Sequence, residues 1–109
     1  MKKIIITETE TTYLIGQNAA DNTQLIKSSE PDWTWVHLEK FPSAHVIICK
    51  LDPTPEEITQ ATSLVWENSK YKFRNIGMIH CKVRNIIHGE EPGSVSFVSN
   101  RQVTKMKYV

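Results

Sequence analysis

The chain is short of the residues that mark several classes of protein. Its 109 residues include only two cysteines, four glycines and five prolines. Two cysteines, Cys49 and Cys81, are too few for the disulfide framework of a small secreted domain, and we expect both thiols to be reduced. The scarcity of glycine and proline excludes collagen-like and low-complexity chains. This composition is typical of one folded globular domain, which we expect to span residues 1–109.

Long hydrophobic runs are also missing. No stretch approaches the roughly 20 apolar residues that a membrane helix needs. The Met-Lys-Lys start leads into an apolar run, residues 4–6, that is too short for the core of a signal peptide. We therefore expect a cytoplasmic protein with no membrane partner.

Positive and negative charges balance over the whole chain but not along it. The formal net charge is +1. Residues 1–69 hold five lysines and ten carboxylates, a net −5, whereas residues 70–109 hold eight lysines and arginines and two glutamates, a net +6. The second part is the one that would attract a polyanion such as nucleic acid.

Runs of β-branched and aromatic residues, separated by turn residues, predict a protein rich in strands. The first two runs flank a short polar break and predict a hairpin, and a turn with Pro42 and Ser43 joins the next two. The expected strands are residues 4–7, 11–15, 34–38, 45–51, 76–84 and 95–98, followed by a last strand after Asn100 and Arg101.

Two segments predict helices. Asn18 can cap a short helix that runs to Ile26. Residues 54–57, Thr-Pro-Glu-Glu, form a capping box with proline at the first helical position. The apolar residues that follow recur every three or four positions, so this helix has one stripe that faces a sheet. We therefore expect an α+β fold, a largely antiparallel sheet with two helices packed on one of its faces.

The sequence offers little support for catalysis or metal binding. The histidines and cysteines lack the paired spacing of a zinc site, and both cysteines fall on apolar faces of predicted strands, where a thiol keeps a high pKa. There is no glycine-rich phosphate loop, and no pair of carboxylates in an apolar context that would tune them for acid and base work. We expect neither an enzyme nor a bound cofactor or metal.

Tryptophan and histidine alternate along residues 33–37. Trp33, Trp35 and His37 share one side of the predicted strand, and aliphatic residues occupy the other side. If only the aliphatic side is core, the three rings form an exposed platform on which bases can stack. If both sides are covered, the rings pack inside, which is the commoner fate of a large aromatic residue in the middle of a strand.

Residues 32–46, Asp-Trp-Thr-Trp-Val-His-Leu-Glu-Lys-Phe-Pro-Ser-Ala-His-Val, resemble the signature of the NFACT-R domain family. Residues 16–22, Gly-Gln-Asn-Ala-Ala-Asp-Asn, are similar to an upstream segment of that family, and residues 79–87 and 92–97 to its later strands. The family includes the RNA-binding module of ribosome-quality-control factors that engage tRNA. The resemblance implies nucleic-acid binding and not catalysis. Because the sequence stops at Val109, without the helical extension or the large partner domains of other members, we expect a standalone module.

We therefore expect an RNA-binding module, with structured RNA such as tRNA as its partner and a link to translation or ribosome quality control. The expected nucleic-acid-binding residues include the four motif residues Trp35, His37, Ser43 and His45, although His37 and His45 are expected to have a mainly structural role. The residues expected to contact phosphates are His80, Lys82, Arg84, Arg101, Lys105 and Lys107. Each of the pairs Lys82/Arg84 and Lys105/Lys107 should project from one side of its strand, and together they could form one patch.

Two alternatives remain open from the sequence. The acidic first part of the chain could dock a protein partner while the basic strands are merely solvated. The same basic surface could also bind DNA.

Overall fold

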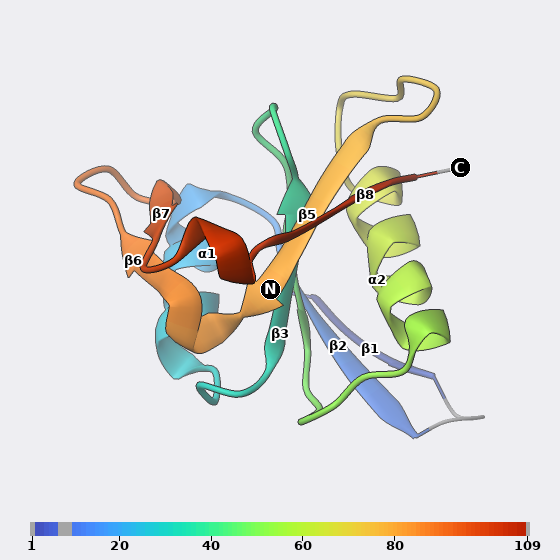
Figure 1. The fold of residues 1–109 in the computed structure, drawn as a ribbon, viewed down its shortest axis with the longest axis horizontal. Helices are drawn as coiled ribbons and strands as arrows, with labels where there is room; N and C mark the ends of the chain where they lie inside the picture. Colours follow the sequence, from blue (N-terminus) through green and yellow to red (C-terminus); the bar gives the residue numbers. More distant parts are fainter. Residues whose placement is uncertain (1, 7–9, 109) are drawn as a thin grey trace.

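Strands and helices follow one another along the chain in the computed structural model, which describes residues 2–6 and 10–108 (Figure 1). The helices are α1 (Ala19–Ser28) and α2 (Pro55–Glu67), and two short 3-10 turns are η1 (Val83–Asn85) and η2 (Asn100–Gln102). The strands are β1 (Lys2–Ile6), β2 (Thr11–Gly16), β3 (Thr34–Leu38), β4 (His45–Ile48), β5 (Gly77–Lys82), β6 (Ile86–His88), β7 (Val95–Phe97) and β8 (Thr104–Lys107).

Six strands form one sheet in the order β1-β2-β4-β3-β5-β8, and β6 and β7 form a second, two-stranded sheet. Each of these neighbouring pairs is antiparallel. The expected α+β fold with a largely antiparallel sheet is therefore confirmed. The predicted first hairpin is present as β1 and β2, although Thr7, the expected end of its first strand, lies outside the described residues.

The two helices cover opposite faces of the sheet, so the expectation that both pack on one face was wrong (Figure 1). Ala61, Leu64 and Val65 of α2 pack in a cluster with Val36 of β3, and Leu25 and Ile26 of α1 belong to a second cluster on the other face. The physical reason is visible in β4, where all four residues are buried. A strand that is apolar on both sides needs a cover on both sides.

The second cluster encloses Trp35, which has no exposed surface. Trp35 packs in this cluster with residues of α1. The centroids of the Trp35 ring and of the Phe97 ring, from β7, lie 5.7 Å apart. The small β6–β7 sheet thus helps to close this face. Of the two arrangements considered for the tryptophans, an exposed platform and packing in the core, Trp35 adopts the second. Trp33 is half-buried and packs against the same cluster.

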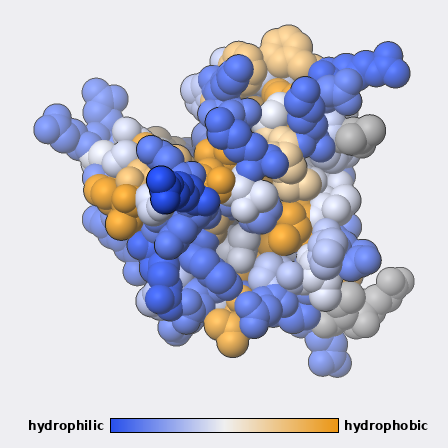
Figure 2. Space-filling model, viewed as in Figure 1, coloured by the Kyte–Doolittle hydropathy of each residue, from blue (hydrophilic) through white to orange (hydrophobic). Residues whose placement is uncertain are grey.

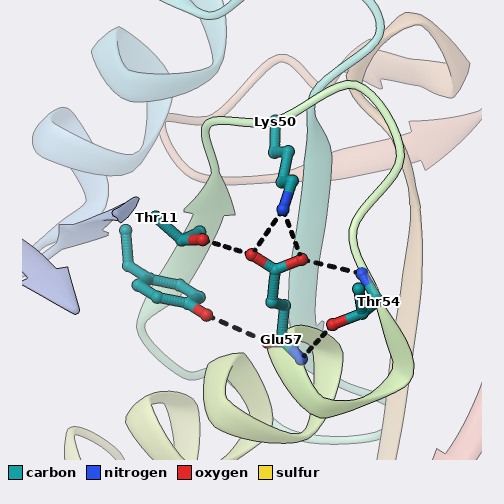
Figure 3. A network of polar contacts seen from close by, with 5 residues as sticks. Thr11, Lys50, Thr54 and Glu57 are labelled. Atoms are coloured by element: carbon teal, nitrogen blue, oxygen red, sulfur yellow. Dashed lines mark hydrogen bonds and ion pairs between the residues drawn. The ribbon is translucent and has the colours of Figure 1, made fainter. Parts of the chain in front are cut away.

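The capping box at the start of α2 is confirmed, and it also ties the helix to the sheet (Figure 3). Thr54 Oγ1 accepts a hydrogen bond from the Glu57 backbone N–H, and Glu57 Oε1 accepts one from the Thr54 N–H at 2.8 Å. The buried Glu57 carboxylate also accepts hydrogen bonds from Thr11 of β2 and from Lys50, which follows β4. One side chain therefore fixes both the beginning of α2 and its position against two strands.

Two strands end at least two residues earlier than expected because their backbone N–H groups donate to other partners. β5 stops at Lys82, and η1 replaces the predicted end of that strand, with the N–H groups of Val83 and Arg84 donating to the carbonyls of Trp33 and Pro31. β4 stops at Ile48, after which the Lys50 N–H turns back to donate to the Ile48 carbonyl.

Neither helix reaches the length and apolarity that crossing a membrane requires, as judged over the described parts of the chain.

Candidate nucleic-acid interface

A cavity of about 550 Å³ opens where the start of α1, the β3–β4 turn, the end of α2 and the Pro92-Gly93 turn meet. Three of the four motif residues, His37, Ser43 and His45, line it. Cavities of about 300 to 1,000 Å³ are typical of small-molecule sites. The motif residues therefore surround a space large enough for a nucleotide-sized group.

His45 is a buried, neutral side chain held by Trp35. The Trp35 indole Nε1–H donates to His45 Nδ1 at 3.0 Å, and His45 is only 2% exposed. Because Nδ1 accepts this hydrogen bond, the proton of the neutral ring resides on Nε2. Burial, and to a smaller extent the neighbouring His37 ring, lower the pKa of His45 from 6.5 to about 3. His45 is therefore uncharged at neutral pH.

His37 lies between these buried rings and the cavity. Its ring stacks on Trp35 with centroids 5.3 Å apart, and it meets His45 edge-on at 4.7 Å. His37 Nδ1 lies 2.5 Å from the Leu38 carbonyl oxygen, which can only accept, so Nδ1 carries the proton and Nε2 is an acceptor. Burial lowers the pKa of His37. The two histidines thus offer one Nε2 donor and one Nε2 acceptor, and no charge.

Ser43 has a structural role in the turn between β3 and β4. Its Oγ accepts a hydrogen bond from the Leu38 N–H at 3.2 Å and donates to the Ala44 carbonyl at 3.0 Å. Both bonds lie beyond the last paired residues of the two strands, at Val36 and Val46. Ser43 therefore holds closed the turn that brings His37 and His45 together.

Gly16 and Asn22, the two ends of the upstream family segment, are in direct contact. A Cβ atom on Gly16 would lie 1.9 Å from Asn22 Oδ1, so only glycine fits there while Asn22 keeps its place. Asn22 lines the cavity and is 7% exposed, and its Oδ1 has no hydrogen-bond partner among the described residues. Asn18 caps α1 beside it, with its Oδ1 accepting from the Asp21 N–H at 2.8 Å.

The Pro92-Gly93 turn forms another wall of the cavity. Gly93 has φ +81°, and a Cβ atom there would lie 3.3 Å from Cα and Cβ of Ala19 in α1. The Gly93 N–H donates to Thr23 Oγ1 at 2.8 Å, so the turn is fastened directly to the helix. Glycine is required at this position both by its positive φ and by the close approach to α1.

Three of the six residues expected to contact phosphates are engaged with carboxylates. Arg84 pairs with Asp32, Lys105 with Glu39 at 3.2 Å, and Lys82 lies 3.9 Å from Asp52 while donating to the Asp32 and Leu51 carbonyls. The other three differ in exposure. Lys107 on β8 and Arg101 in η2 are exposed, whereas His80 is half-buried, and burial lowers its pKa.

The pairs Lys82/Arg84 and Lys105/Lys107 do not form one patch. Residues opposite each other in an antiparallel pair share a face of the sheet. Lys105 lies opposite Ile79, on the face that α1 covers, and Lys82 lies opposite Thr34, on the face that α2 covers. The expected single patch was wrong because Lys82 and Lys105 project from opposite faces of the sheet. Arg84 moreover lies in η1 and not on a strand.

Both cysteines have free thiols. Burial raises the pKa of Cys49 and of Cys81 to about 11, with the hydrogen bond from Asn85 opposing the shift at Cys81. Both thiols are therefore protonated at neutral pH. Over residues 2–6 and 10–108, no three His, Cys, Asp or Glu side chains gather closely enough to hold a metal ion.

Sequence reasoning missed Lys70 and Tyr71, which line the cavity from the segment between α2 and β5. Neither residue belongs to the motif residues or to the residues expected to contact phosphates. The signal was present in residues 70–74, where lysine or arginine alternates with an aromatic residue. It became meaningful only when the fold placed this segment beside the β3–β4 turn.

Comparisons with known proteins agree with this picture. The chain is similar to two proteins named Rqc2 homolog RqcH, from Streptococcus suis (strain 05ZYH33), at 31% identity over 101 residues, and from Bacillus subtilis (strain 168), at 28% over 96 residues. These matches cover 88% and 84% of this chain but only 18% and 17% of those proteins, so the chain spans less than a fifth of their length.

The fold has a counterpart among solved structures. The C-terminal part of the fibronectin/fibrinogen-binding protein of Streptococcus suis superposes with a TM-score of 0.87 over 97% of this chain and 44% of that one, at 23% sequence identity. The model of the NFACT protein RNA binding domain matches residues 1–105. Since that match leaves out only the last four residues, the chain belongs to the NFACT protein RNA-binding domain family.

Proposed function

We propose that this domain binds structured RNA, with tRNA as the candidate ligand, and that it acts in ribosome quality control in the cytoplasm. The family's description as an RNA-binding domain and the names of the two relatives support the general role. The observation that carries the proposal is the cavity between α1 and the β3–β4 turn, because residues of the family motif converge on it.

The chemistry of the cavity suits a nucleotide that is not base-paired. The neutral His37 and His45 supply an acceptor and a donor, which can hydrogen-bond to a base edge. Around them, the first turn of α1 has backbone N–H groups without an acceptor inside the helix, and Lys70 adds a positive charge. A phosphate is favoured at such a rim, while the base lies deeper among the uncharged groups.

The direct test is binding of fluorescent tRNA to the purified domain, followed by anisotropy. We expect Lys70→Glu to weaken binding about tenfold, since a hydrogen bond to a charged group contributes roughly 1.5 to 3 kcal/mol. Lys27→Glu is the matched control, because Lys27 is also exposed but lies in the last turn of α1, at the far end from the cavity.

Three outcomes separate the possible functions. Loss of affinity in Lys70→Glu but not in Lys27→Glu supports the cavity as the RNA site. Equal affinity for tRNA and for duplex DNA of the same length indicates general polyanion binding. Absence of tRNA binding by the wild-type domain at low salt contradicts the proposal and favours a protein-interaction module.

A further inference from the structure

Three aromatic rings from two separate loops gather at one end of the molecule. Phe41 from the β3–β4 turn stacks on Tyr71 with centroids 4.7 Å apart, and Phe73 lies 5.5 Å from Phe41. Phe73 is 55% exposed. Figure 2 shows hydrophobic side chains at the upper end of the molecule, where the α2–β5 loop projects in Figure 1, with hydrophilic side chains around them.

The aromatic residues of the α2–β5 loop are interleaved with positively charged residues. Lys70, Lys72 and Arg74 alternate with Tyr71 and Phe73, and no aspartate or glutamate occurs in residues 68–89. Unlike Lys82, Arg84 and Lys105, these three cations form no ion pair with any described residue. The surface is therefore both aromatic and cationic.

The aromatic surface continues toward the C-terminus. Lys72 Nζ lies 4.4 Å above the centre of the Trp66 ring, which in turn stacks on Tyr108 at 5.3 Å. A second cavity, of about 410 Å³, opens between these rings and Phe73. The aromatic surface also borders the first cavity, because Tyr71, which stacks on Phe41, lines that cavity together with Lys70.

We propose that Phe41, Tyr71 and Phe73, flanked by Lys70, Lys72 and Arg74, form a stacking surface for single-stranded RNA. This inference rests on the proposed function, which identifies RNA as the ligand, and adds a second surface to which that RNA binds. Bases have π faces that stack on exposed aromatic rings, and their phosphates pair with the interleaved cations. A protein partner would need acidic and apolar groups in the same alternation, whereas every unpaired stretch of RNA has both features already. The strand leaves the first cavity and continues over these rings.

The test compares binding of a fluorescent 12-nucleotide oligouridylate, a 12-base-pair RNA duplex and tRNA. We expect Phe73→Ala to weaken binding of the oligouridylate about fivefold or more, because stacking on one ring contributes roughly 1 to 3 kcal/mol per base. Phe73→Tyr keeps an aromatic ring, so it should retain the wild-type affinity for the oligouridylate. Both variants should bind the RNA duplex with the wild-type affinity. Leu51→Ala is the matched control, since Leu51 is 59% exposed and lies at the start of a different loop.

The outcomes distinguish this inference from the proposed function. Unchanged oligouridylate binding in Phe73→Ala and in Phe41→Ala/Phe73→Ala, with wild-type melting temperatures, overturns the stacking surface. If the domain binds tRNA but not oligouridylate, the stacking surface is also overturned, but the proposed function stands. If it binds oligouridylate but not tRNA, the stacking surface stands and the proposed function is overturned. If light scattering shows a dimer that Phe73→Ala abolishes, the rings pack against a second copy of the chain, and the inference is wrong.

Discussion

His45 occupies a place where a charged ring would be unfavourable. Its Nδ1 accepts from the buried Trp35 indole, and the nearest polar neighbour on the other side is another imidazole, that of His37. A proton on Nδ1 would break the bond to Trp35 and put a positive charge in the protein interior. The residue thus fixes Trp35 and shapes the floor of the cavity without contributing charge.

We expect His45→Ala to lower the free energy of unfolding by about 1 to 3 kcal/mol, because the Trp35 indole N–H would lose its buried partner. Urea unfolding followed by tryptophan fluorescence measures the change. His88→Ala serves as a control, since His88 is exposed on β6. A His45→Ala variant that melts like the wild type but no longer binds RNA would instead make His45 a contact residue.

The lowered pKa of His45 also predicts how stability depends on pH. Because the folded-state pKa of about 3 lies below the unfolded value of 6.5, the unfolded chain binds the proton first as the pH falls. The stability that depends on the neutral His45 ring is therefore present above pH 6.5, and it is lost progressively as the pH falls toward 3. The lowered pKa values of His37 and His80 act in the same direction.

Between pH 7.5 and pH 5.5, we expect the titration of His45 alone to lower the free energy of unfolding by about 1.4 kcal/mol. This interval lies above the range in which carboxylates titrate, so the histidines dominate it. Unfolding by urea at the two pH values, in wild type and in His45→Gln, gives the contribution of this one ring. Equal losses in both proteins would show that His45 is charged, or solvated, in the folded state.

At the scale of secondary structure, α2 is the element with the most specific attachment to the sheet. Burial by itself would raise the pKa of Glu57, but the hydrogen bonds from Thr11, Thr54 and Lys50 outweigh burial and lower the pKa to about 2. The carboxylate is therefore ionised in the folded protein at neutral pH. It closes the capping box and holds β2 and the end of β4 at the same time.

We expect Glu57→Gln to reduce the free energy of unfolding by about 1.5 to 3 kcal/mol, since it removes hydrogen bonds to a charged acceptor. Glu56→Gln is the matched control, because the adjacent Glu56 is exposed in the same first turn. Thermal unfolding of both variants measures the difference. A loss in Glu56→Gln as large as in Glu57→Gln would mean that the charge acts only through the helix dipole.

For the molecule as a whole, strand order converts the charge asymmetry of the sequence into a partial asymmetry in space. β5 and β8, from the basic part of the chain, form one edge of the large sheet, and β1 and β2 form the other. His37, which lines the cavity, lies on the face of the sheet that α1 covers, since it is paired with Ile79. Lys105 projects from this same face, where it meets Glu39, and Lys82 projects from the opposite face.

This arrangement predicts unequal contributions of the two basic pairs to RNA binding. Each phosphate contact contributes about −0.7 to the log-log salt slope for single-stranded RNA. We expect Lys105→Ala/Lys107→Ala to flatten the slope by about 1.4, the share of two contacts. We expect Lys82→Ala/Arg84→Ala to leave the slope unchanged, because Lys82 projects from the opposite face of the sheet and Arg84 is paired with Asp32. Anisotropy at several salt concentrations measures both, and the opposite ranking would place the RNA on the α2 side.

Local patterns in the sequence were sufficient for most of the fold. The alternation along residues 34–38 and the capping box at residues 54–57 predicted β3 and the start of α2, because both depend on sterics and hydrogen bonds between near neighbours in the chain. The motif of His37, Ser43 and His45 could likewise be recognised from the sequence. For Trp35 the alternation left two possibilities, an exposed stacking platform and a packed ring, and only the fold decided for the packed ring. Position along a strand is enough to say which residues share a side.

Only the tertiary structure decided what covers each side and how the side chains behave there. The sequence did not show that α1 and α2 lie on opposite faces of the sheet or that Lys82 and Lys105 project from opposite faces. It also did not show that Phe41 contacts Tyr71, thirty residues further along the chain. It also left open the charge of His45, which depends on burial beside Trp35 and His37. Exposure, pKa and surface continuity are set by neighbours in space, and most of those neighbours are remote in the sequence.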